Sequence, residues 1–143
     1  MELGKIRGDV LLVEIRRELN PDIIDKIKTN FVGDGSYSRD VMCQEFVHTM
    51  TFLPDSIFVL VGYVNNEIVG HFVAYKPENR NYVFLDQAWN ISTIENSKIA
   101  FDKLKEWTKS IGLNEIRFAT KRDSVAYKFW GFEQHLVILQ MIF

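Results

Sequence analysis

The sequence is poor in cysteine and in net charge, and it has no long hydrophobic run. Its one cysteine, Cys43, excludes an internal disulfide bond and fits a reducing compartment. The net charge is -2 and Lys and Arg do not cluster, so we expect no nucleic-acid partner. No apolar run approaches the roughly 18 residues of a membrane-spanning helix, and early charges interrupt any signal-peptide core. These absences predict a cytoplasmic protein that has no membrane partner.

Apolar and aromatic residues are plentiful. Of the 143 residues, 47% are hydrophobic and 11 are phenylalanine, which is enough to build one substantial core. There is no internal repeat and no composition shift that would mark a linker. We therefore expect a single domain over residues 1–143.

Hydrophobic periodicity and turn residues divide the chain into alternating strands and helices. Strands are expected at residues 10–15, 57–63, 67–75, 82–89 and 115–119, with one or two final strands over 132–143. Helices are expected at 21–30, 39–51, 93–111 and 122–129. Asn65-Asn66 suits a hairpin turn, and Gly112 suits a helix end. The order β-α-α-β-β-β-α-β-α-β predicts an α/β (α+β) domain with a mixed sheet, and the β-α-β crossover predicts that strands 82–89 and 115–119 run parallel and separate near Trp89.

The most distinctive stretch is residues 112–132. A helix ends at Gly112, a short strand follows, and an amphipathic helical turn carries Tyr127 toward the pair Gly131-Phe132. This stretch and the crossover before it resemble the GCN5-related N-acetyltransferase (GNAT) family. The resemblance covers residues 57–143 well and the N-terminal half in element order only. The short length also resembles small phage-type GNAT-like proteins.

The resemblance implies an acyltransferase that moves an acetyl group from acetyl-CoA to the amine of a small molecule or protein. Tyr127 would correspond to the tyrosine that protonates the departing thiolate. Asp86, in an otherwise apolar strand, would correspond to the carboxylate that takes up a proton, often through water. Backbone groups from Trp89 to Ile91, where the strands splay, would hold the cofactor arm.

The family's glycine-rich pyrophosphate loop is degenerate in this chain. The matching window is residues 92–97, where Glu95 stands in place of the first glycine and Ser97 is the small residue. Ser92 and Glu95 also have the spacing of a capping box, in which their side chains satisfy the helix's own N–H groups. If acetyl-CoA binds, Asn96, Ser97, Lys98 and free backbone groups are expected to hold it, and Arg122 to contact a phosphate.

Each of these interpretations has an alternative. Asp86 could form a structural salt bridge with Arg117, and Tyr127 could simply pack among neighbouring aromatics. The whole chain could be a catalytically inactive GNAT-fold module that binds a protein partner, or an unrelated α+β domain with the same element order. The sequence also leaves a homodimer open. His48, His71 and His135 are too scattered for a metal site, and we expect His71 to be a satisfied core or surface histidine.

Overall fold

The computed structural model describes residues 6–7, 10–11, 13–31, 39–89, 94–119, 133–135 and 138–143. The helical elements are α1 (Ile23–Ile27), η1 (Lys28–Asn30), α2 (Arg39–Phe52), η2 (Pro54–Ser56) and α3 (Ile94–Ser110). The strands are β1 (Ile6–Arg7), β2 (Val10–Leu11), β3 (Glu14–Glu18), β4 (Ile57–Val64), β5 (Glu67–Tyr75), β6 (Val83–Trp89), β7 (Glu115–Ala119), β8 (Glu133–His135) and β9 (Ile138–Ile142).

A seven-stranded sheet organises the molecule, with strand order β3-β4-β5-β6-β7-β9-β8. Its neighbouring strands are antiparallel except for β6 and β7, which run parallel as the crossover predicts. Helix α3 connects this parallel pair. The predicted mixed-sheet fold class is therefore confirmed, while the predicted helix at residues 122–129 lies outside the described residues.

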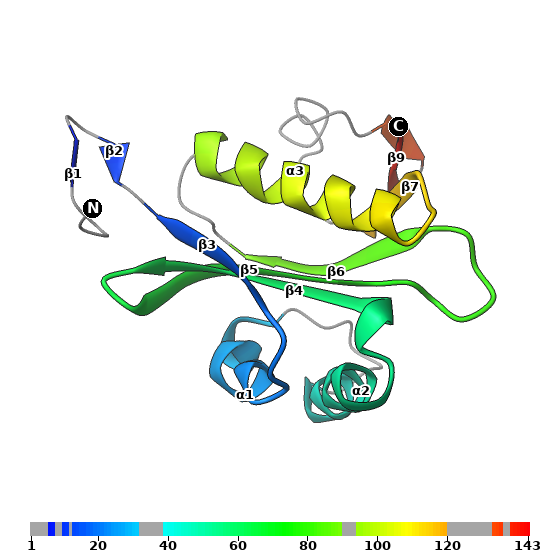
Figure 1. Ribbon diagram of the computed structural model, residues 1–143, viewed down its shortest axis with the longest axis horizontal. Helices are drawn as coiled ribbons and strands as arrows, with labels where there is room; N and C mark the ends of the chain where they lie inside the picture. The colour runs from blue at the N-terminus through cyan, green and yellow to red at the C-terminus, as the bar shows by residue number, and fades with distance from the viewer. Residues whose placement is uncertain are drawn as a thin grey trace.

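The helices form a layer on each face of the sheet. Figure 1 shows α3 on one face and the pair α1 and α2 on the other, with the strands between them. Each layer has its own core. The α3 core includes Leu60, Leu85 and Leu104, and the α1–α2 core includes Ile24, Ile27 and Phe46, all of them buried.

Two turns have the geometry that their residues favour. Asn65 and Asn66 link β4 to β5 with φ of 51° and 64°, a left-handed conformation that asparagine tolerates. Gly112 ends α3 with φ of 83°, and its N–H donates to the Lys109 carbonyl at 2.9 Å. These turns fix the register of the β4–β5 hairpin and the point at which the chain leaves α3.

The N-terminal boundaries differ from the predicted ones. The expected strand at 10–15 is divided, because β2 pairs with β1 while β3 joins the main sheet beside β4. The first α-helix begins at Ile23 rather than at Pro21, and Asn20 Oδ1 accepts the Asp22 N–H at 2.9 Å within the preceding turn. The apolar pattern therefore predicted a strand at residues 10–15, whereas the strand that joins the main sheet is β3, Glu14–Glu18.

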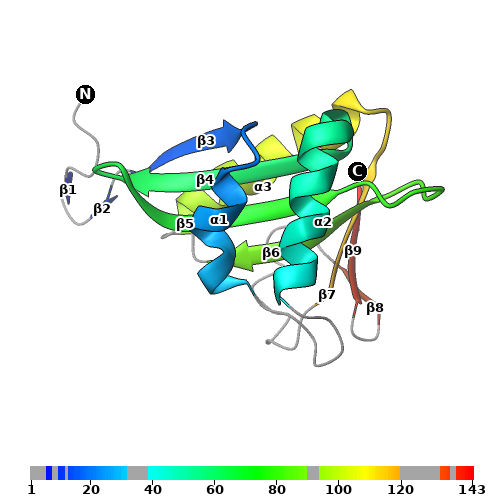
Figure 2. The same cartoon turned by 90° about the horizontal axis from the view of Figure 1, so that it is seen from below.

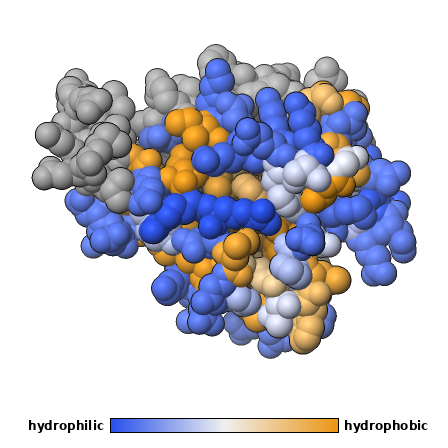
Figure 3. All heavy atoms as spheres, viewed as in Figure 1, coloured by the Kyte–Doolittle hydropathy of each residue, from blue (hydrophilic) through white to orange (hydrophobic). Residues whose placement is uncertain are grey.

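The surface is unevenly polar. Figure 3 shows apolar side chains gathered over the part where α2 lies, below a band of hydrophilic ones. On and just after α2, Phe52 is 68% exposed and Leu53 is 58% exposed. Among the described residues, no helix is long and apolar enough to cross a membrane.

Candidate active site

The parallel strands β6 and β7 separate before β6 ends. Their pairing runs from Val83 opposite Ile116 to Leu85 opposite Phe118, whereas β6 continues to Trp89. Figure 2 shows the arrowhead end of β6 and the far part of β7 pointing in different directions. The separation was predicted near Trp89 and instead starts after Leu85. A longer stretch of β6 backbone, residues 86–89, is thereby released from the β7 ladder.

A β-bulge lies where the strands separate. On the other side of β6, Val73 of β5 pairs with Gln87 and the next residue, Ala74, pairs with Leu85. Asp86 is therefore the extra residue of the bulge. Such a bulge interrupts the alternation of side chains across a strand. As a result both Asp86 and Gln87 face the α1–α2 layer, where Gln87 Nε2 donates to Met42 Sδ of α2 at 3.3 Å.

Asp86 is held by neutral hydrogen-bond donors. Gln87 Nε2 donates to Asp86 Oδ1 at 3.0 Å, and the Tyr75 hydroxyl also donates to the carboxylate. Burial raises the pKa of Asp86 above its usual value, these two hydrogen bonds act to lower it, and the nearby charge of Glu45 raises it further. A carboxylate whose pKa is raised and that lies where two strands separate can accept a proton from a bound group.

Arg117 does not take the role considered for it in the sequence. Its guanidinium binds Glu115 on its own strand and lies 4.0 Å over the Tyr82 ring. The ion pair with Asp86 is not formed between these two described side chains. A salt bridge with Arg117 therefore does not explain why this partly buried carboxylate lies on β6.

His71 is a core residue, one of the two locations expected for it, but within the described part of the chain it is not satisfied as expected. It is fully buried on β5 opposite Trp89, and neither ring nitrogen has a hydrogen-bond partner among the described residues. Its ring packs edge-on to Phe31 at 5.3 Å and near Trp89 at 5.7 Å between centroids. Burial lowers its pKa to about 4, so the imidazole is neutral at pH 7. The sequence did contain a signal for its location. His71, Val73 and Tyr75 are spaced two residues apart on β5, so they share one face of the sheet, which is also the face of Asp86.

Some of the predicted cofactor residues are described by the structure, and others are not. Trp89 ends β6, and Asn96, Ser97 and Lys98 lie in the first turns of α3, where Asn96 is buried and Lys98 is exposed. Only residues 90–93 connect these two elements, so the strand end and the helix start lie near each other in the chain. Ile91, Arg122, Tyr127 and Ser92 lie outside the described residues, as does the side chain of Glu95. The predicted capping box and the position of Tyr127 therefore stay predictions.

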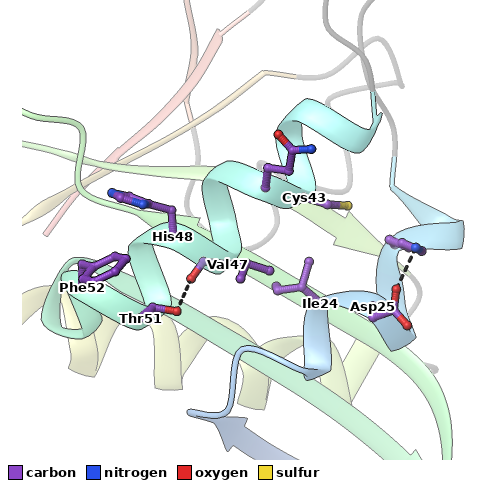
Figure 4. Close-up of a pocket in the computed structure, with 9 residues that line it drawn as sticks. Ile24, Asp25, Cys43, Val47, His48, Thr51 and Phe52 are labelled. Carbon is purple, nitrogen blue, oxygen red and sulfur yellow. Dashed lines mark hydrogen bonds and ion pairs between the residues drawn. The ribbon is translucent and has the colours of Figure 1, made fainter.

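A separate hollow of about 400 Å³ lies between α1 and α2. Figure 4 shows Ile24 and Val47 pointing toward one another across it, with Cys43 beside them and the Asp25–Lys28 ion pair at one end. None of the predicted site residues that the structure describes lines this hollow. Within the described ranges, no group of three or more His, Cys, Asp or Glu side chains could hold a metal ion.

Comparison with known sequences gives no match to a family model and none to a curated protein. Comparison with solved structures gives many matches. One is the PaiA N-acetyltransferase of Thermoplasma acidophilum in complex with coenzyme A, with 14% identity over 93% of this chain and 100% of that one and a TM-score of 0.64. Another is a GNAT-family acetyltransferase of Brucella melitensis in complex with acetyl-CoA, with 13% identity, 92% and 88% coverage and a TM-score of 0.65.

A third similar structure is an aminoglycoside 6'-acetyltransferase type Ii, with 12% identity over 90% of this chain and 96% of that one and a TM-score of 0.65. Identities this low show the fold and leave the likeness to phage-type proteins a prediction. The agreement spans nearly the whole chain, including the N-terminal half that the sequence matched only in element order. The chain therefore has the GNAT fold.

Proposed function

We propose that this protein transfers an acetyl group from acetyl-CoA to an amine. One observation carries the proposal: Asp86, a carboxylate that has no cationic partner among the described residues, lies on a bulge where β6 leaves β7. The fold supports the same conclusion by analogy, since the similar solved structures are acetyltransferases.

The described residues fit an acyl-CoA ligand at this place. The backbone of β6 beyond Leu85 is no longer paired with β7, and an extended ligand arm would lie along this part of the strand. The first turn of α3 presents the positive end of the helix dipole, which favours phosphates. Lys98 is exposed in that region and adds a positive charge.

In this mechanism the chain moves two protons and holds the reactants. Acetyl-CoA would supply a thioester as the acyl donor and would leave as a thiol. Asp86 accepts the proton of the attacking amine, directly or through one water, and Tyr127 donates a proton to the departing sulfur. Backbone groups at Trp89 and Ile91 align the cofactor arm, while Asn96, Ser97, Lys98 and Arg122 bind its phosphates.

Thiol release in the presence of an amine panel tests the proposal. We expect release that depends on both acetyl-CoA and an amine, and a loss of about a hundredfold or more in Asp86→Asn. Glu67→Gln, an exposed carboxylate on β5, serves as the control and should retain the activity. Equal rates in the unmodified protein and Asp86→Asn would remove Asp86 from the mechanism. Tyr127→Phe assigns the second proton in the same assay.

Glu95 should limit cofactor affinity, because a carboxylate at this point of the loop repels phosphate. We expect acetyl-CoA to bind weakly by isothermal titration and Glu95→Gly to bind it more tightly. A micromolar dissociation constant in the unmodified protein would show that Glu95 does not obstruct the site. If neither protein binds acetyl-CoA, the acetyltransferase proposal fails. The alternative, a GNAT-fold module that binds a protein partner or a second copy of itself, would then replace it.

A further inference from the structure

We propose that Tyr75 and Gln87 are positioning residues for Asp86, and that together with Glu45 they set the pH at which Asp86 takes up a proton. The inference rests on the proposed function, because it assigns roles around the same carboxylate. None of these three residues is marked by a sequence motif.

Both the ring and the hydroxyl group of Tyr75 have contacts that fix the side chain. Its ring packs against Phe84 of β6 at 6.0 Å and against Phe46 of α2 at 6.2 Å between centroids. Its hydroxyl donates to Asp86. Because packing holds the ring, the hydroxyl is presented to the carboxylate at little further entropic cost.

Gln87 connects Asp86 to the helical layer. Its side chain is buried, at 2% exposed, and Nε2 donates both to Asp86 Oδ1 at 3.0 Å and to Met42 Sδ at 3.3 Å. The bulge makes this possible, since in a regular strand two successive side chains would lie on opposite faces. Gln87 therefore orients the carboxylate relative to α2.

The groups around Asp86 act on its charge in opposite directions. Tyr75 and Gln87 donate hydrogen bonds that favour the ionised carboxylate, and the negative charge of Glu45 on α2 disfavours it. Two further titratable groups lie on nearby strands: the charge of Arg117 is offset by its ion pair with Glu115, and His71 is neutral above a pKa of about 4. Among the described residues, the groups that act on Asp86 are thus two neutral donors and one anion.

The test is a carboxyl carbon NMR titration of Asp86, with the pH profile of thiol release as a second readout. Tyr75→Phe and Gln87→Met remove donors, so the titration midpoint and the acidic limb of the profile should move to higher pH. Glu45→Gln removes the anion and should move both to lower pH. Shifts of opposite sign are the signature of charge tuning, because a purely structural defect would lower the rate without reversing direction.

Matched controls are available in the chain. Tyr63→Phe removes a hydroxyl that binds another carboxylate, Glu18, and Asp40→Asn neutralises a different exposed acid on α2. Both should leave the Asp86 midpoint unchanged. If the buried Gln87 variant does not fold, Tyr75→Phe retains the ring and Glu45→Gln changes an exposed residue, so these two decide.

The two proposals can fail separately because the NMR titration needs no acetyl transfer. Unchanged midpoints in Tyr75→Phe and Glu45→Gln would overturn the inference, whatever the activity. Opposite shifts without any amine-dependent thiol release would establish the tuning of Asp86 and overturn the proposed function. Opposite shifts in both readouts would support both proposals.

Discussion

The two faces of the sheet differ in the polarity of their buried residues. The face under α3 is apolar, and its buried polar Thr108 is satisfied because its hydroxyl donates to the Leu104 carbonyl at 2.7 Å. The face under α1 and α2 contains Asp86, Gln87 and His71 within an otherwise apolar core. Since one sheet supplies both faces, the difference agrees with the proposed site on β6, because buried polar groups do not add to the stability of an apolar core.

The bulge at Asp86 explains how one strand can serve both layers. Before the bulge, Val83 and Leu85 point to the α3 core in regular alternation. After it, Ala88 again packs on the α3 side, so the core register is recovered while an extra polar residue is added opposite. A strand can thus gain a functional side chain without losing a core position.

The largest effect is expected in the α3 core. Leu104 is fully buried, so Leu104→Ala should lower the free energy of unfolding by about 3 kcal/mol, through lost transfer free energy and a residual cavity. Urea denaturation measures this. Ile99→Ala on the same helix is the control, because Ile99 is 47% exposed and its truncation should change little. Similar losses in both variants would contradict the assigned core.

A pH-dependent loss of stability is expected from the opposite face. Burial lowers the pKa of His71 from 6.5 to about 4, so the unfolded chain binds its proton first as pH falls. The His71 contribution is therefore fully present above pH 6.5 and is lost progressively toward pH 4, by up to about 3 kcal/mol. Urea denaturation across this window measures the slope. His71→Phe should flatten it, and an unchanged slope would assign the effect to other groups.

The smallest expected effects are changes of opposite sign in the free energy of unfolding at pH 7, produced by substitutions of two buried polar residues. His71→Phe removes two unsatisfied nitrogens and should raise the free energy of unfolding by about 1 kcal/mol. Thr108→Val removes a satisfied hydroxyl and should lower it by about 1 kcal/mol. Losses in both variants would mean that His71 is satisfied in solution and that the two faces do not differ.

Much of the fold could be predicted because local signals and long-range pattern agreed. Asn65-Asn66 and Gly112 adopt the left-handed conformations expected of them, and the crossover around α3 gives the parallel β6–β7 pair. The N-terminal strand was misplaced because its apolar residues precede the charged strand that enters the sheet. There, pairing with β4 outweighs the local β propensity.

The candidate site was predicted less completely. Asp86 stood out because a carboxylate in an apolar strand is costly, but the bulge that turns Gln87 to the same face leaves no mark in the sequence. His71 was taken for a satisfied histidine because hydrogen-bond partners depend on residues distant in the chain. The roles of Tyr127, Ile91 and Arg122 stay predictions.

The outer strand β3 bears on how copies of the protein could assemble. Among the described strands it pairs with β4 alone, so its other edge has no strand partner within that part of the chain and could in principle accept another chain. Four of its five residues, Glu14, Arg16, Arg17 and Glu18, are charged. Adding a strand there would strip water from these charges, and this guards against sheet-to-sheet growth and amyloid-like polymerisation. A homodimer of this protein would accordingly form through a surface other than the β3 edge.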